Sequence, residues 1–232
     1  MKIPGLLLAL LLATPAFAAP PHIRLTEGAS YLPARPPGTT YPLLLLLHGA
    51  DGTPAEMIDR FRALADRLGV ALLAPTSAGD TWDVMQRPHR DGAVSADGVT
   101  RTGGSPDTAR IDAAVASLTA RARIDPHRRV LLGFSDGATM ALGYGTDRGR
   151  VFTAVLAVAP GIANVASRVA RGRRVIILRD GADRLLPFAA MSSRIAPALR
   201  RAGLRVKLVT RVGSHDITAE AFTLAAASLN SR

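Results

Sequence analysis

Two kinds of hydrophobic pattern alternate along the chain. Short, largely apolar runs of strand length recur, at 43–47, 70–74, 130–134, 153–158, 175–178 and 206–210. Between them lie segments that repeat apolar residues at helical spacing, at 53–69, 105–118, 187–201 and 219–229. Buried strands that alternate with amphipathic helices predict an α/β fold, with a mostly parallel central sheet and helices on both faces.

Capping residues and helix breakers refine this pattern. Thr53-Pro54-Ala55-Glu56 combines an N-cap, a proline in the first turn and a capping box, and Gly69 closes the same helix. Prolines and glycines interrupt 22–41, which predicts short edge strands where the sheet begins antiparallel. Residues 76–104 show little periodicity and contain the one tryptophan, Trp82, so we expect a long loop there that is either functional or disordered.

The apolar run at 130–134 ends inside the motif Gly133-Phe134-Ser135-Asp136-Gly137, and helix-compatible residues follow this motif. This order predicts a nucleophile elbow, in which a strand ends, Ser135 stands at the apex of a sharp turn, and a helix begins. Gly133 and Gly137 flank Ser135 at a distance of two residues, where a Cβ atom would collide with the other side of so tight a turn. An ordinary strand–turn–helix connection fits the same residues. The two interpretations differ in whether a base, an acid and oxyanion donors accompany the serine.

A serine nucleophile needs a general base, because a neutral hydroxyl is weakly nucleophilic. His215 is the only histidine after Ser135. It follows the run at 206–210, at the end of a parallel sheet where ligand-binding loops gather. The preceding strand leads to two candidates for the acid that orients the imidazole. Asp183 is preferred because it lies further into the loop, and Asp180 is the alternative.

Backbone N–H groups are the expected oxyanion donors, from Ala50 after the run at 43–47 and from Asp136 beside the serine. We expect His48 to brace its turn structurally. The remaining histidines are expected at the surface or near the start of the chain: His22, His89 and His127. The sequence has no His-x-x-x-His pair and no cysteine, so we predict neither a metal site nor a cofactor.

The net charge of +11 comes almost entirely from arginine, since Lys2 and Lys207 are the only lysines. The arginines are scattered, and the tightest groups stand at predicted strand or helix ends. This distribution favours a compositional bias with weak affinity for anionic surfaces, and we expect no nucleic-acid partner. A protein that binds polyanions is the alternative, and steeply salt-dependent retention on heparin would reveal it.

The first residues have the pattern of an export signal. Lys2 precedes an apolar core, and Ala16-Phe17-Ala18 supplies a cleavage site. Residues 1–18 are therefore predicted to be a signal peptide and 19–232 a single α/β domain. The core is too short to span a bilayer, so we expect a periplasmic or secreted protein without a stable membrane anchor.

Several motifs together resemble the α/β-hydrolase superfamily: Leu47-His48-Gly49, Gly133-Phe134-Ser135-Asp136-Gly137, Gly181-Ala182-Asp183 and Gly213-Ser214-His215. The likeness is greatest to phospholipase/carboxylesterase-like proteins and to exported esterases similar to polyhydroxybutyrate depolymerases and feruloyl esterases. It implies Ser135 as nucleophile, Asp183 as acid and His215 as base, with Ala50 and Asp136 as oxyanion donors. Ala138 stands where many of these relatives have a second glycine.

The expected function is that of an exported serine hydrolase that cleaves carboxylic esters through an acyl-enzyme on Ser135. About sixteen residues separate the runs at 153–158 and 175–178, too few for a helical cap domain, so we expect an open site for small or oligomeric ester substrates. A polyester depolymerase or a peptidase on the same residues is an alternative. A catalytically inactive binding protein of the same fold is another, and the oligomeric state is left open.

Overall fold

The computed structural model describes residues 22–86, 100–102, 105–185 and 188–230. The predicted signal peptide and His89 lie outside these residues. Within the described part of the chain, no helix is both long enough and apolar enough to cross a membrane.

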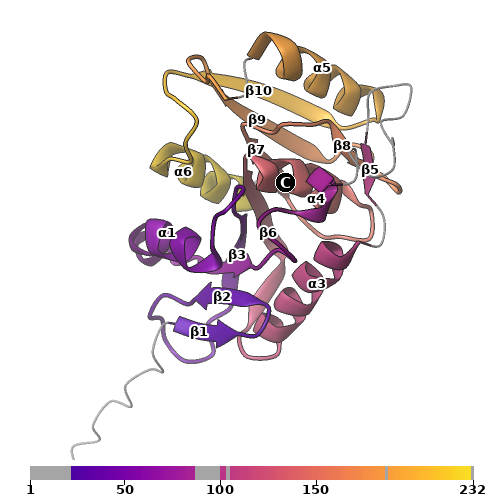
Figure 1. Ribbon diagram of the computed structural model, residues 1–232. Helices are drawn as coiled ribbons and strands as arrows, with labels where there is room; N and C mark the ends of the chain where they lie inside the picture. Colours follow the sequence, from indigo (N-terminus) through magenta and orange to yellow (C-terminus); the bar gives the residue numbers. More distant parts are fainter. Residues whose placement is uncertain (1–21, 87–99, 103–104, 186–187, 231–232) are drawn as a thin grey trace, which may run out of the picture.

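Eight strands form one twisted sheet in the order β1-β2-β4-β3-β6-β7-β9-β10 (Figure 1). They are β1 (His22–Leu25), β2 (Gly28–Tyr31), β3 (Tyr41–Leu47), β4 (Ala71–Pro75), β6 (Ile124–Phe134), β7 (Ala154–Val158), β9 (Arg174–Asp180) and β10 (Arg205–Arg211). Strands β1 and β2 pair antiparallel, β2 pairs antiparallel with β4, and every later pair is parallel. The predicted sheet, with its antiparallel start, is confirmed.

Helices cover both faces of this sheet (Figure 1). They are α1 (Pro54–Leu68), α3 (Pro106–Thr119), α4 (Asp136–Thr146), α5 (Phe188–Arg201) and α6 (Ala219–Ala227), which a short 3₁₀ turn (Ser228–Asn230) follows. One core lies under α1 and α6, where the rings of Phe61 and Phe222 stack at 4.9 Å. The other lies under α3, α4 and α5.

Strand β3 contributes to both cores at once. Its leucines from 43 to 47 are at most 1% exposed, and alternate residues enter opposite cores because successive strand side chains point to opposite faces. Full burial of one leucine stabilises a fold by about 1.5–3 kcal/mol. The burial of this apolar run therefore stabilises the centre of the sheet. The turn that follows begins at the well-packed end of β3.

Helix α1 has the ends that its sequence predicts. The hydroxyl of Thr53 accepts the N–H of Glu56, and the carboxylate of Glu56 accepts the N–H of Thr53. Gly69 ends the helix in a left-handed conformation, with φ of 62°. These caps fix the position of the helix that directly follows the turn after β3.

Two features depart from the sequence pattern. Strand β6 begins at Ile124, before its apolar run, because the register with β3 shifts between Tyr41 and Leu43 and so accommodates Pro126. A separate parallel pair, β5 (Thr100–Thr102) with β8 (Asn164–Ala166), lies outside the main sheet. Each of these strands has three residues, too few for a periodic pattern to be visible.

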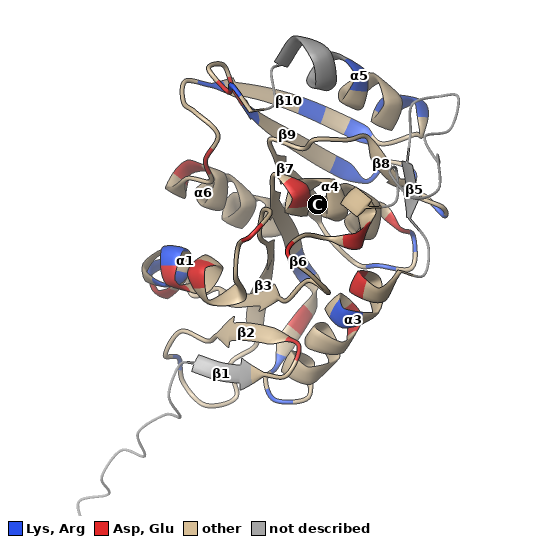
Figure 2. Ribbon diagram, viewed as in Figure 1, with Lys and Arg blue, Asp and Glu red and all other residues tan. Residues whose placement is uncertain are grey.

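Strand β10 forms one edge of the sheet. The side chains of Arg205 and Lys207 are exposed along it, and Figure 2 shows basic residues on β9, β10 and α5.

Candidate active site

Ser135 lies between β6 and α4 in a backbone conformation that is unusual for a residue with a side chain. Its φ is 52° and its ψ is −117°. Such a conformation costs about 1–3 kcal/mol and persists where neighbouring contacts enforce it. Here the Ser135 N–H donates to the carbonyl of Val158 at 2.9 Å, and its carbonyl accepts the N–H groups of Ala138 and Thr139. The strain is therefore held by β7 and by the first turn of α4.

Two glycines make the turn sterically feasible. A Cβ on Gly133 would overlap the carbonyl of Gly137, and a Cβ on Gly137 would overlap the carbonyls of Leu47 and His48. These obstacles are backbone atoms, which cannot rotate away. The predicted elbow is thus present, and it presses directly against the turn after β3.

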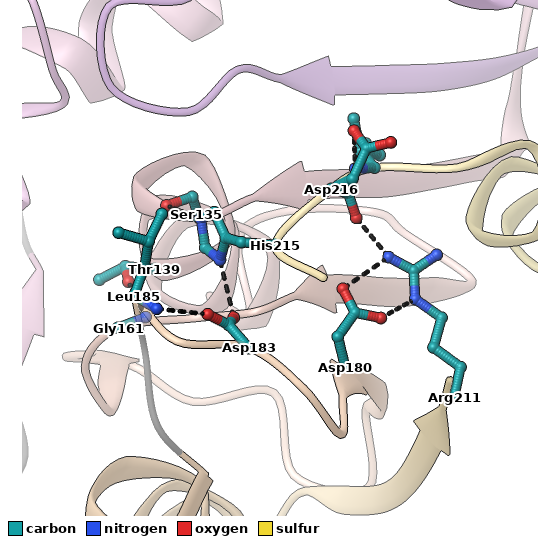
Figure 3. Close-up of polar contacts among 10 residues, drawn as sticks. Ser135, Thr139, Gly161, Asp180, Asp183, Leu185, Arg211, His215 and Asp216 are labelled. Atoms are coloured by element: carbon teal, nitrogen blue, oxygen red, sulfur yellow. Dashed lines mark hydrogen bonds and ion pairs between the residues drawn. The ribbon is translucent and has the colours of Figure 1, made fainter. Parts of the chain in front are cut away.

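The structure brings the three predicted side chains into one hydrogen-bonded chain (Figure 3). Nε2 of His215 lies 3.0 Å from Oγ of Ser135, and Nδ1 lies 2.7 Å from Oδ2 of Asp183. The other carboxylate oxygen of Asp183 accepts the N–H of Leu185 at 2.9 Å. The side chains of His215 and Asp183 are 13% and 4% exposed. The imidazole is thus fixed between a buried carboxylate and a hydroxyl.

Asp180, the alternative acid, has a different partner (Figure 3). Its carboxylate is fully buried and pairs through both oxygens with the guanidinium of Arg211, whose side chain is 6% exposed. Asp180 is the last residue of β9, and its register partner on β10 is Arg211. The carboxylate that contacts His215 is therefore that of Asp183.

Arg211 also holds the loop that carries His215. Its guanidinium donates to the carbonyl of Asp216 and to the hydroxyl of Thr218, so it holds the segment that directly follows the histidine. Sequence analysis missed this residue, because an arginine in a basic protein carries no signal of its own. The only available signal was the pairing of the ends of β9 and β10, which requires the register.

The two candidate oxyanion donors lie in segments beside the elbow. Ala50 follows β3 in an exposed turn, and Asp136 is the first residue of α4. No acceptor in the described residues meets the backbone N–H of either. The turn lies against the elbow, since a Cβ built on Gly49 would be 3.3 Å from Cβ of Ser135. Both N–H groups are thus in segments that adjoin the serine.

His48 is buried in this turn, as the sequence suggested for a structural residue. It is 2% exposed, its Nδ1 lies 2.8 Å from the carbonyl of Gly49, and its ring packs on Trp82 with centroids 4.9 Å apart. Burial lowers the pKa of His48 below its ordinary value of 6.5, although the Gly49 carbonyl opposes this shift. A neutral ring therefore donates Nδ1–H to that carbonyl.

A cavity of about 610 Å³ adjoins the site between α1 and the His215 loop. Ala50, Met57, Phe134 and Ile217 give it an apolar lining, and the exposed ion pair of Arg60 with Asp216 stands at 3.0 Å among its polar residues. Within the described residues, no group of histidine, cysteine or acidic side chains could hold a metal ion.

The segment between β7 and β9 lies against α4 instead of rising above the site. The Thr139 hydroxyl accepts the N–H groups of Gly161 and Ile162, and the amide of Asn164 donates to the Thr139 carbonyl at 2.9 Å. No cap domain is present in the part of the chain that the structure describes.

Comparison with known proteins finds esterase relatives. Residues 27–198 match the family model described as Esterase PHB depolymerase. NocK of Nocardia uniformis subsp. tsuyamanensis, which carries an esterase designation, is 33% identical over 175 residues. The match covers 72% of this chain and 46% of NocK, so the chain spans about half the length of the curated relative that it matches.

Solved structures share the fold at low sequence identity. Esterase PE8 aligns over 88% of this chain and 97% of its own, with a TM-score of 0.64 and 24% identity. The LpqC poly(3-hydroxybutyrate) depolymerase from Bordetella parapertussis aligns over 88% and 83%, with a TM-score of 0.63 and 20% identity. A phospholipase/carboxylesterase from Dyadobacter fermentans DSM 18053 aligns over 89% and 97%, with a TM-score of 0.57 and 18% identity.

The sheet order, the elbow and these neighbours establish the α/β-hydrolase fold that the motifs predicted. The match over 27–198, which is most of the chain, shows that the protein belongs to the esterase PHB depolymerase family.

Proposed function

We propose that the protein is a serine hydrolase that cleaves carboxylic esters through an acyl-enzyme on Ser135. The observation that carries this proposal is the continuous contact from Asp183 through His215 to Ser135. The family match supports the choice of ester as the substrate class.

In the proposed reaction, Ser135 Oγ attacks the acyl carbon while Nε2 of His215 takes the hydroxyl proton. Asp183 holds the imidazole in the required tautomer and stabilises the imidazolium that forms. The N–H groups of Ala50 and Asp136 bind the oxyanion of the tetrahedral intermediate. His215 then gives its proton to the departing alcohol, and water releases the acyl group by the same steps in the second half of the reaction.

The site favours small or oligomeric esters. It has no cap over it in the described residues, and the adjoining cavity of about 610 Å³ combines an apolar lining with a charged rim. A polyester depolymerase is the second candidate, because the family model and LpqC carry that description. Turnover of hydroxybutyrate oligomers relative to simple esters and peptides separates these activities.

We also propose that the protein is exported to the periplasm or secreted. The support is the positively charged start, the apolar core and the Ala16-Phe17-Ala18 site within residues 1–18. Expression of the full chain, followed by N-terminal sequencing of the exported product, tests cleavage after Ala18.

The Ser135→Ala variant tests the mechanism. We expect kcat on p-nitrophenyl acetate to fall by about 10⁴–10⁶-fold, because the nucleophile, base and acid act as a unit. Covalent labelling by a fluorophosphonate probe should disappear with it. Ser167→Ala, at a different serine of the chain, is the matched control and should keep both activities. A wild-type protein that neither hydrolyses esters nor reacts with the probe would instead be an inactive member of the fold.

A further inference from the structure

Three consecutive residues of the loop after β4 contact the two segments that carry the oxyanion amides. The carbonyl of Asp80 accepts the N–H of Asp51 at 2.8 Å. The hydroxyl of Thr81 donates to the carboxylate of Asp136 at 2.5 Å, and the indole N–H of Trp82 donates to the carbonyl of His48 at 2.8 Å. The segment 80–82 therefore connects the turn after β3 to the start of α4.

These contacts bear on how the Ala50 amide is oriented. A peptide plane has its carbonyl and its N–H on opposite sides, so a held Gly49 carbonyl fixes the direction of the Ala50 N–H. That carbonyl accepts from His48 Nδ1 at 2.8 Å and from the N–H of Gly52 at 3.2 Å. Trp82 in turn packs on the His48 ring and binds its carbonyl.

Asp107 of α3 anchors both sides of this segment. Its carboxylate is fully buried, and its two oxygens accept the N–H groups of Ala78 at 2.6 Å and of Asp83 at 2.7 Å. Burial raises the pKa of Asp107, while these two N–H groups oppose the shift. Both carboxylate oxygens are thus committed to residues that flank 80–82.

We propose that the segment 80–82, anchored by Asp107, sets the separation and orientation of the two oxyanion N–H groups, with Thr81 and Asp107 as positioning residues. This inference rests on the proposed function. Neither residue touches the reacting atoms. Their effect passes through the backbone of the turn after β3 and through Asp136.

The test compares Thr81→Val, which removes the hydroxyl and keeps the side-chain shape, with Thr81→Ser, which keeps the hydroxyl. We expect Thr81→Val to lower kcat on p-nitrophenyl acetate by about 10- to 100-fold, because a displaced oxyanion donor weakens transition-state stabilisation. KM should change by less than about twofold, and Thr81→Ser should recover most of kcat.

A transition-state probe separates positioning from general stability. A trifluoromethyl ketone forms a tetrahedral adduct with the serine, so its Ki should rise by the same factor as kcat falls. The pH profile of kcat/KM should keep its wild-type midpoint, because His215 is untouched. The control is Thr223→Val on α6, whose exposed hydroxyl donates to the carbonyl of Ala219 in its own helix.

Asp107→Asn is a second, independent test of the inference. An amide has one acceptor oxygen in place of two, so this variant loses one of the hydrogen bonds from Ala78 and Asp83. We expect the same fall in kcat and the same rise in the trifluoromethyl ketone Ki, measured at a temperature where circular dichroism shows the variant folded. The inference is overturned if Thr81→Val matches Thr223→Val, or if kcat falls while the Ki stays constant. If the wild-type protein shows no Ser135-dependent hydrolysis, the proposed function itself fails and this inference fails with it.

Discussion

Replacing Arg211 by methionine is the sharpest test of how the His215 loop is held. Methionine keeps much of the aliphatic length and removes every hydrogen-bond donor. The change leaves the Asp180 carboxylate, which is fully buried, without its cation. It also removes the donors to the Asp216 carbonyl and the Thr218 hydroxyl.

Breaking a buried ion pair from one side costs about 3–5 kcal/mol, because an uncompensated charge remains in the interior. Folded domains are stable by only about 5–15 kcal/mol, so this loss is a large part of the total. For a chain of this size it corresponds to a fall in Tm of about 10 °C. In the double variant Asp180→Leu with Arg211→Met, both charges are absent, and we expect most of that stability to return.

Activity should behave differently from stability. In the double variant the loop still lacks the guanidinium that binds Asp216 and Thr218 just after His215, so kcat on p-nitrophenyl acetate should stay low after stability recovers. Urea unfolding followed by circular dichroism gives the free energies, and steady-state kinetics gives kcat. For the unfolding measurement Arg60→Met is the control, since its ion pair with Asp216 is about half exposed and such pairs contribute at most about 1 kcal/mol. The reasoning is refuted if Arg211→Met is no less stable than Arg60→Met.

Two further predictions concern the turn after β3. Gly137→Ala should lose at least about 2 kcal/mol in urea unfolding, because its Cβ meets backbone carbonyls, whereas Gly79→Ala, with 3.7 Å to its nearest neighbour, should unfold like the wild type. Burial lowers the pKa of His48 below 6.5 in the folded protein. As the pH falls through 6.5, the His48 side chain of the unfolded chain therefore takes up a proton before that of the folded protein does. This proton uptake favours the unfolded chain and lowers the free energy of unfolding. Between about pH 7.5 and pH 5, the free energy of unfolding should therefore fall less in His48→Asn than in the wild type. An equal fall in both proteins would contradict this account.

The sequence was informative wherever local chemistry determines structure. Gly133 and Gly137 indicate a tight turn that has no room for a Cβ atom at either position. This turn predicted the position of Ser135 between a strand and a helix. His215 and Asp183 could be found because each follows an apolar strand, and parallel strands bring their ends to one edge of the sheet.

The rest depended on distances that no local pattern encodes. Asp180 and Asp183 are the same residue type, so their identity does not distinguish them. Only the register of β9 with β10 shows that Arg211 lies opposite Asp180 and pairs with its carboxylate. Asp107 reads as an ordinary acidic residue in the first turn of a helix, yet its carboxylate holds a loop that precedes it by more than twenty residues. Buried polar contacts between distant segments are visible only after folding.

The exposed cations on β10 have a consequence for solubility. A last strand presents unpaired N–H and C=O groups, which can recruit a strand from another molecule and start aggregation. Stacking two such edges would bring Arg205 and Lys207 against their own copies, and the repulsion opposes growth of a shared sheet. We therefore expect these two cations to oppose edge-to-edge self-association of the protein.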